Sequence, residues 1–169
     1  MPDWLVPEQV YDLPRRIALL DTNVLIALVD PRDNWHDHTV AAIDLGEFKW
    51  VVTYPSLIEA WNLLVGRQRR LDLAYELMNW IFTPRQAILL GDAIEPVATA
   101  HSYSQRFRID LVDASLIDLA DRMSRECDLN PSVHVATYDT GDFTRLLGIP
   151  GLNFNVYDMR DITSTTGFD

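Results

Sequence analysis

Residues 17–30 read IALLDTNVLIALVD, and this stretch decides the expected fold. Residues 17–20 are all apolar, which is typical of a strand that is buried on both faces within a parallel sheet. The apolar run ends abruptly at Asp21, and the residues that follow have helical spacing. A buried strand followed at once by a helix is the repeating unit of an α/β domain.

The same alternation continues to the end of the chain. Further strands are predicted at residues 50–54, 87–90, 133–137 and 153–157. Helices are predicted over residues 36–48, 56–67, 71–82, 96–106, 111–127 and 142–147. The predicted fold is therefore α/β, with a mostly parallel central sheet and helices on both of its faces.

Length and composition predict one folded domain. The chain has 169 residues, 48% of them hydrophobic, and contains no internal repeat and no Gly/Ser linker. We divide it into an N-terminal extension (1–15), the α/β domain (16–158) and a C-terminal tail (159–169). No apolar run is long enough to span a membrane, and the N-terminal segment has no basic region typical of a secretory signal. Together with a single cysteine, Cys127, these features predict a cytoplasmic protein.

The net charge argues against a nucleic-acid partner. Against 14 Lys and Arg residues stand 25 Asp and Glu residues, which gives a formal net charge of −11. Nucleic-acid-binding domains are usually basic. Only a group of acids that converge to bind cations would reverse this expectation, because bound cations present positive charge to a phosphate.

Two acids directly follow predicted strands. Asp21 comes after IALL, and Asp139 comes after VHVATY. In α/β folds the ligand site lies outside the carboxyl ends of the strands, so these positions are candidates for a binding site. Each Asp is equally compatible with the N-cap of the next helix.

Helical periodicity separates the other acids. Asp113 lies at the edge of the apolar stripe of helix 111–127, where core meets cleft. Asp110, Asp118 and Asp121 fall on the opposite side, so we expect them to face solvent. Glu59 lies nearly opposite the apolar stripe of its own helix, and periodicity alone predicts a surface residue there. Its position soon after a strand nevertheless places it near the same sheet edge.

Carboxylates that meet at one edge favour a hard divalent cation such as Mg²⁺ or Mn²⁺. Zinc is not indicated, because one cysteine and four scattered histidines lack ligand spacing. His36 and His38 open a predicted helix and are expected to be polar surface residues. The sequence has no Gly-rich phosphate loop and no Gly-x-Ser-x-Gly elbow.

Four segments in order carry a resemblance to a known family: LLDTNVLIAL (19–28), SLIEAWNLL (56–64), VDASLIDLA (112–120) and ATYDTGDF (136–143). Over about residues 16–158 the chain resembles the PIN-domain nucleases, and among them it is most similar to VapC-type toxins. The resemblance implies that Mg²⁺ or Mn²⁺ is held for RNA hydrolysis by Asp21, Glu59, Asp113 and Asp139. Asp142 matches a further acid that many members carry. Asn23 and Thr137 match residues that would aim the carboxylates by hydrogen bonds.

The resemblance implies a metal-dependent endoribonuclease, the toxin of a toxin–antitoxin module, that forms a homodimer and binds an antitoxin protein. A housekeeping RNA-processing or DNA-directed PIN nuclease fits the same residues. A non-catalytic PIN interaction module would be expected to have lost acids. An aspartyl-phosphate phosphatase is disfavoured because Asn23 stands where its second Asp is needed. Candidate RNA contacts are Arg67, Arg69 and Arg70, whose alternative role is that of a solvated helix end.

Overall fold

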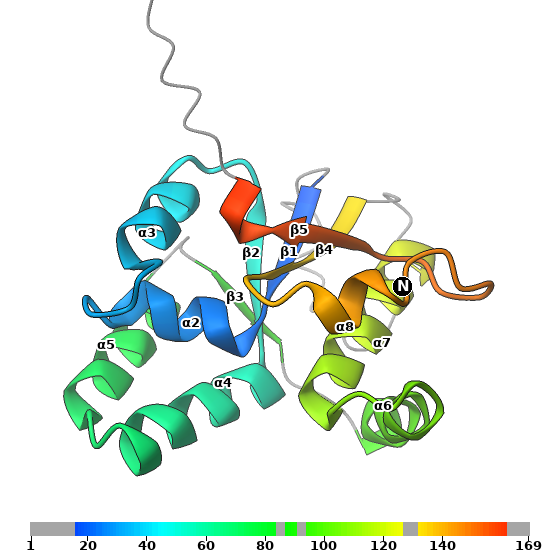
Figure 1. Cartoon of the computed structure of the whole chain (residues 1–169), viewed down its shortest axis with the longest axis horizontal. Helices are drawn as coiled ribbons and strands as arrows, with labels where there is room; N and C mark the ends of the chain where they lie inside the picture. The colour runs from blue at the N-terminus through cyan, green and yellow to red at the C-terminus, as the bar shows by residue number, and fades with distance from the viewer. Residues whose placement is uncertain (1–15, 84–86, 91–93, 127–131, 162–169) are drawn as a thin grey trace, which may run out of the picture.

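The structure, a computed structural model, describes residues 16–83, 87–90, 94–126 and 132–161. It contains a five-stranded sheet in the order β3-β2-β1-β4-β5, in which every pair of neighbouring strands is parallel (Figure 1). The strands are β1 (Arg16–Leu20), β2 (Lys49–Thr53), β3 (Ile88–Leu90), β4 (Ser132–Thr137) and β5 (Asn155–Asp158). The predicted α/β fold with a parallel sheet is confirmed. The N-terminal extension, Cys127 and most of the C-terminal tail lie outside the described residues.

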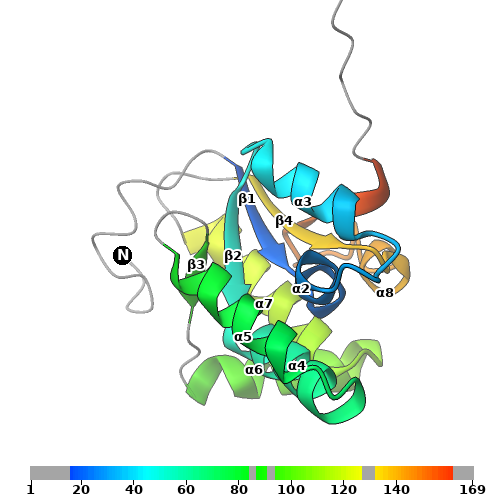
Figure 2. The ribbon, with the colours of Figure 1, turned by 90° about the vertical axis from the view of Figure 1, so that its left-hand side faces the viewer.

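Helices cover both faces of the sheet (Figures 1 and 2). One face packs against α2 (Thr22–Val29), α3 (His36–Asp44), α4 (Tyr54–Asn62) with its π-helical continuation η1 (Leu63–Arg67), and α5 (Leu71–Phe82). The other face packs against α6 (Ile94–Phe107), α7 (Leu111–Glu126) and the short α8 (Gly141–Thr144). A 3₁₀ turn, η2 (Met159–Asp161), ends the described chain, and Met159 lies fully buried in the first of these two cores.

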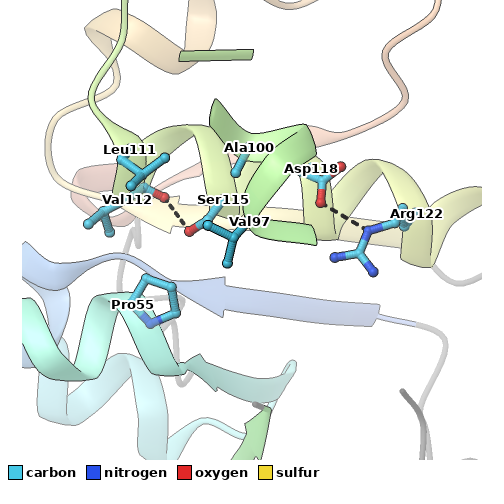
Figure 3. A pocket seen from close by; sticks show the side chains of 8 residues that line it. All are labelled: Pro55, Val97, Ala100, Leu111, Val112, Ser115, Asp118 and Arg122. Carbon is cyan, nitrogen blue, oxygen red and sulfur yellow. Dashed lines mark hydrogen bonds and ion pairs between the residues drawn. The ribbon is translucent and has the colours of Figure 1, made fainter. Parts of the chain in front are cut away.

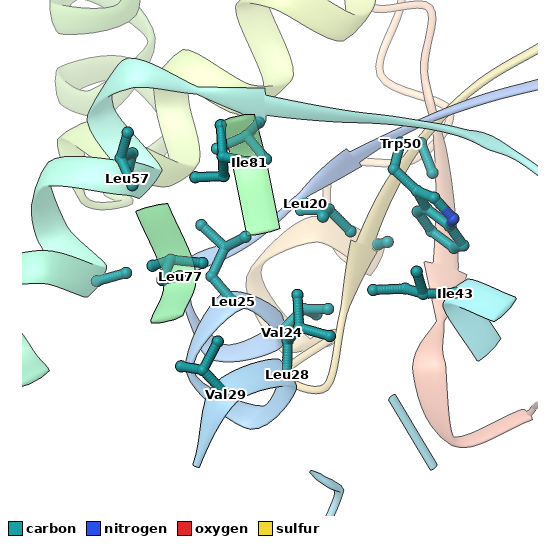
Figure 4. Packing of buried hydrophobic residues seen from close by; sticks show 14 of the residues in the cluster. Leu20, Val24, Leu25, Leu28, Val29, Ile43, Trp50, Leu57, Leu77 and Ile81 are labelled. Carbon is teal, nitrogen blue, oxygen red and sulfur yellow. The ribbon is translucent and has the colours of Figure 1, made fainter. Parts of the chain in front are cut away.

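The alternation of side chains along β1 supplies both cores. Ala18 and Leu20 point into the core under α2 to α5, and Ile17 and Leu19 point into the core under α6 and α7. All of these side chains are completely buried. Figure 4 shows Leu20 packed among residues of the first core, which include Leu25 and Leu77. The apolar run at 17–20 is therefore explained by a central strand that is covered on both sides.

Several helix ends differ from the predicted ones. Helix α3 ends at Asp44 rather than at residue 48, because Gly46 adopts a positive φ of 67°, the conformation that terminates helices. Helix α4 begins at Tyr54, with Pro55 in its first turn, and changes to π-helical geometry at Leu63. Helix α8 ends at Thr144, before the predicted end at residue 147.

The order of the strands places a crevice beside β1. From β1 the chain adds β2 and β3 on one side of the sheet and then crosses to add β4 and β5 on the other. The segments that follow β1 and β4 therefore leave neighbouring strands at the point where the strand order reverses, which is where α/β folds bind ligands. Within the described ranges no helix combines the length and the apolar character needed to cross a bilayer.

Candidate active site

A cavity of about 230 Å³ opens at the carboxyl end of β1. It is lined by Asp21, Thr22, Asn23, Ile26, Glu59, Leu63, Asp110, Asp113, Asp139, Asp142 and Phe143. These residues come from α2 and its N-cap, from α4 and η1, from the start of α7, from the segment that follows β4, and from α8. All five acids predicted for the site, and Asn23, thus lie around one cavity.

Asp21 is the most enclosed of these carboxylates, with only 6% of the residue exposed. One of its oxygens accepts a hydrogen bond from the backbone N–H of Thr22 at 2.6 Å, which makes Asp21 the N-cap of α2. The other oxygen accepts from the Asn23 amide at 2.7 Å and from the Thr137 hydroxyl at 2.6 Å. Capping and a place in the cavity are therefore compatible roles of the same side chain.

Asn23 and Thr137 join the ends of β1 and β4. The Asn23 amide also donates to the Thr137 hydroxyl oxygen at 3.0 Å, and its carbonyl oxygen accepts from the backbone N–H of Tyr138 at 3.2 Å. The same hydroxyl oxygen accepts from the backbone N–H of Asp139 at 3.0 Å. Thr137 is fully buried and does not line the cavity, but it links Asp21 to the turn that carries Asp139.

Glu59 lies in the cavity, although periodicity predicted a surface residue. Helix α4 packs through Leu57 and Ala60, while Ile58 is half exposed, so the buried face differs from the predicted stripe. This rotation brings Glu59 to the flank of the helix, where its carboxylate accepts a hydrogen bond from the Thr22 hydroxyl at 2.6 Å. The surface prediction was wrong because the apolar stripe on which it rested includes Ile58, and the fold leaves that residue half exposed.

The start of α7 supplies two carboxylates to the cavity. Asp113 is partly buried in its first turn, as the helical angle predicted. Asp110 is exposed, as predicted, and it also lines the cavity: it precedes the helix, and its carboxylate accepts a hydrogen bond from the backbone N–H of Asp113 at 2.8 Å. Asp is a favoured N-cap residue, and its side chain accepts a hydrogen bond from the backbone N–H of the third helical residue. Taking Asp110 as the N-cap of the helix would therefore have placed it beside Asp113 at the cavity.

Asp118 and Asp121, also on α7, are not solvated as predicted but 2% and 5% exposed. Figure 3 shows Asp118 beside Arg122 in a separate cavity of about 80 Å³ between α4, α6 and α7. Asp121 pairs with Arg125 at 2.7 Å and accepts from the backbone N–H of Asn153 at 2.6 Å. The prediction failed because α6 and the segment before β5 cover a face that the sequence of α7 alone marks as polar.

Most carboxylates of the cavity at the end of β1, called the acidic cavity below, lack a cationic partner. Among the described residues, the ion pair of Asp142 with Arg145, at 3.1 Å, is the one that involves a predicted site acid. Burial raises the pKa of Asp21 to about 6. Burial, and then the neighbouring charges of Asp110 and Asp21, raise the pKa of Asp113 to about 8. The site thus gathers six acids, of which Asp142 alone forms an ion pair with a described Lys or Arg.

The donor chemistry of this cavity fits a hard divalent cation. Every ionisable group that lines it is a carboxylate, and such oxygens are the ligands preferred by Mg²⁺ and Mn²⁺. Among the described residues, no group of three or more Asp, Glu, His or Cys side chains lies close enough together to hold a metal ion as the structure stands. The carboxylates share a cavity, and the repulsion of Asp113 by the neighbouring charges of Asp110 and Asp21 is of the kind that a bound cation would relieve.

The other predicted residues lie elsewhere. Arg67, Arg69 and Arg70 lie at and just after the end of η1 and do not line the cavity; Arg70 pairs with Asp72 at 2.7 Å. The two histidines expected on the surface are partly buried and hydrogen-bonded, which corrects that prediction. His36 Nδ1 lies 2.8 Å from the carbonyl oxygen of Ala27, and His38 Nε2 lies 2.6 Å from that of Met159.

Comparison with known proteins agrees with this geometry. The family model of the PIN domain matches residues 18–146, and the chain belongs to the PIN domain family. Proteins of this family are nucleases and generally use divalent metal ions. No curated protein matches the sequence.

Solved structures of low sequence identity share the fold. VapC20 of Mycobacterium tuberculosis, a Sarcin-Ricin loop cleaving toxin, is 15% identical with a TM-score of 0.61, over 76% of this chain and 94% of that one. DNA-bound VapBC from Salmonella typhimurium is 16% identical with a TM-score of 0.55, over 85% and 98% of the two chains. FitAB bound to a DNA fragment is 21% identical with a TM-score of 0.57, over 88% and 99%.

Proposed function

We propose that this protein is a Mg²⁺- or Mn²⁺-dependent endoribonuclease that hydrolyses RNA phosphodiester bonds. The observation that carries the proposal is the cavity at the switch point of a PIN-domain sheet, which collects Asp21, Glu59, Asp113 and Asp139 from separate segments. Asp110 and Asp142 complete its acidic lining. No other described cavity combines this position with this chemistry.

The protein's own residues have distinct parts in the proposed reaction. Asp21, Asp113 and Asp139 would hold the cation, and Asn23 and Thr137 fix the orientation of the Asp21 carboxylate. When bound, the cation lowers the pKa of a water molecule and stabilises charge on the phosphate. Glu59, held by the Thr22 hydroxyl at 2.6 Å, would act as a ligand or as the base that orients the attacking water.

Cleavage assays with and without a chelator test this proposal. Purified protein incubated with structured RNA is expected to cut in Mg²⁺ or Mn²⁺ and to stop in excess EDTA. Asp113→Asn serves as the matched protein control, and it should show no cutting under either condition if the activity belongs to this site. Equal cleavage by the wild-type protein in EDTA would overturn the metal-dependent mechanism.

RNA contact is proposed for Arg67, Arg69 and Arg70. Arg67 and Arg69 are exposed or partly exposed, and Arg69 adopts a positive φ of 56°, which is uncommon for a side chain of this size. Replacing all three with Gln should weaken RNA binding and flatten its dependence on salt, because fewer counterions are released. An unchanged salt slope would return these arginines to the role of a solvated helix end.

The proposed biological role is that of the toxin in a toxin–antitoxin module, acting as a homodimer with an antitoxin partner. Support comes from the four sequence segments and from the likeness in fold to VapC20, which is itself a toxin. Induced expression in a bacterial host should arrest growth, and Asp113→Asn should not. A small upstream gene that encodes a DNA-binding, antitoxin-like protein would support this role, and co-expression of that protein should then restore growth. Normal growth with the active protein would favour a housekeeping nuclease, and a monomer in light scattering would contradict the dimer.

A further inference from the structure

We propose that Trp35 and Tyr138 form an aromatic platform on which an unpaired base of the RNA substrate stacks, next to the acidic cavity. This inference rests on the proposed ribonuclease function and adds a substrate subsite to it. Trp35 immediately precedes α3, and Tyr138 follows β4. Neither residue lines the acidic cavity.

The rings of Trp35 and Tyr138 are stacked, and Trp35 is partly exposed. Their centroids are 4.9 Å apart and their planes differ by 17°. Trp35 is nevertheless 38% exposed, which is a large exposed surface for so large an aromatic side chain. Tyr138 covers one face of the Trp35 ring and His38 packs against the ring at 70°, so the exposed 38% is the indole surface that these two residues leave uncovered. A flat, open indole face is the surface on which nucleobases stack.

Surrounding contacts hold the platform rigid. The Tyr138 hydroxyl lies 2.7 Å from that of Thr39, which is fully buried. His38 packs edge-on against Trp35 at 5.9 Å and is itself fixed by its hydrogen bond to Met159. The backbone N–H of Trp35 donates to Asp33 at 2.8 Å. A ring held in this way loses little conformational entropy when a base stacks on it.

The backbone connects the platform to the acidic cavity. Tyr138 directly precedes Asp139, so their Cα atoms are about 3.8 Å apart. The backbone N–H of Tyr138 donates to Asn23, which lines the cavity and also holds Asp21. A base on Trp35 would therefore belong to a nucleotide that flanks the phosphate at the carboxylates.

An arginine lies on the same side of the molecule. Arg160 donates to the Thr140 hydroxyl at 3.2 Å, two residues after Tyr138, and its side chain is 46% exposed. It is paired with Asp158 at 2.6 Å, so its position is fixed. Stacking rather than net charge has to supply the affinity here, because the chain is strongly acidic. An unpaired base fits this surface better than a duplex, whose bases are already stacked on each other.

Steady-state cleavage of a short single-stranded RNA tests the platform. Trp35→Leu should raise KM about tenfold and leave kcat within about twofold, as expected for the loss of one stacked base. Trp35→Phe keeps a stacking ring and should restore most of the lost affinity. Tyr75→Leu is the matched control, because Tyr75 is a 56% exposed aromatic residue that packs edge-on against Trp61, and it should leave KM unchanged.

A second measurement starts from the wild-type protein and changes the RNA. Abasic sites are placed one at a time along the RNA, and the wild-type protein should show a raised KM at one position near the cleaved bond. In Trp35→Leu that abasic penalty should disappear. Unchanged KM in Trp35→Leu, or no sensitive abasic position, overturns the platform while cleavage itself stands. Failure of the wild-type protein to cleave any RNA overturns the proposed function and the platform together.

Discussion

Helix α7 carries two kinds of buried acid. Asp118 and Asp121 each have an arginine one turn later, Arg122 at 3.0 Å and Arg125 at 2.7 Å. Asp113, in the first turn of the same helix, forms no ion pair with a described Lys or Arg and instead faces other carboxylates of the cavity. On this helix, the two acids that lie under other segments are paired with arginine, whereas the acid that lines the cavity has carboxylates as its charged neighbours.

The largest expected effect is on catalysis. Asp113→Asn and Asp21→Asn should each lower the cleavage rate by about 10²–10⁴-fold, because each removes a carboxylate from the site. Asp121→Asn, on the same helix as Asp113, should cleave within about threefold of the wild-type rate at a temperature where it is folded. Single-turnover assays with matched protein concentrations measure all three rates. Equal losses in the three variants would erase the distinction between the two kinds of acid.

The free energy of unfolding should depend on the acids that are paired with arginine, whereas the cleavage rate should not. Asp118→Asn should destabilise the protein by about 3 kcal/mol, because it breaks a largely buried ion pair with Arg122. Asp121→Asn should destabilise it by about 1–2 kcal/mol, because the side chain of its partner Arg125 is 47% exposed. Asp121→Asn also weakens the hydrogen bond from the backbone of Asn153. Urea unfolding followed by circular dichroism gives these free energies. Losses below about 0.5 kcal/mol in both variants would show that the pairs contribute little to the fold.

The dependence of stability on pH should carry the signature of the unpaired acids. Because the folded protein raises the pKa of Asp21 from 3.8 to about 6 and that of Asp113 to about 8, it holds these protons more tightly than the unfolded chain. Their contribution is therefore complete below about pH 4 and is lost as the pH rises through 6 and 8. In EDTA we expect Asp21 alone to contribute a loss of about 3 kcal/mol over this range, with a further loss from Asp113, measured by urea unfolding at several pH values.

Paired acids should behave in the reverse sense. The arginine partners Arg32 and Arg160 lower the pKa values of Asp30 and Asp158, so the stability that these pairs contribute is present above about pH 4 and is lost in acid. Saturating Mg²⁺ should flatten the loss between about pH 4 and 8 and leave the acid limb in place. A flat profile in EDTA would contradict the assignment of raised pKa values at the cavity.

The smallest expected effect is on the metal-free protein at neutral pH. Asp113→Asn should stabilise it by about 1 kcal/mol, because Asp113 must take up a proton when the wild-type chain folds, whereas asparagine is neutral in both the folded and the unfolded state. Mg²⁺ at about a hundred times its dissociation constant should stabilise the wild type by about 2.7 kcal/mol and the variant by much less. Thermal melting of both proteins with EDTA and with Mg²⁺ measures this. A variant that melts lower in EDTA, with no response to metal in either protein, would make Asp113 structural.

Local sequence patterns were sufficient to predict the central strand and the acids that follow the strands. The apolar run at 17–20 predicted the central strand, and the position of Asp21 and Asp139 directly after strands predicted the edge of the sheet where the cavity lies. These inferences hold because a parallel sheet brings the carboxyl ends of its strands to one edge whatever the details of packing. Helix ends were less well predicted, since a positive φ at Gly46 stops α3 before its periodic pattern runs out.

Periodicity failed where a helix has neighbours on more than one side. Glu59, Asp118 and Asp121 were all assigned to solvent, yet Glu59 meets Thr22 across the cavity and the other two lie beneath other segments of the chain. For Glu59, the resemblance to PIN domains pointed to the site where the angular argument did not. The spacing of apolar residues along one helix identifies its strongest apolar face and carries no information about a second covered face.

By itself, then, the sequence determined the parallel α/β sheet, the family and the set of acids that could form a site, because strand burial and residue order are local properties. Only the tertiary structure decided which acids of α7 are paired with arginine and which share a cavity with other carboxylates. It also brought Trp35 against Tyr138, which lies far later in the chain, beside that cavity. Pairing of charges and stacking of rings depend on distances between segments remote in sequence, and folding alone sets those distances.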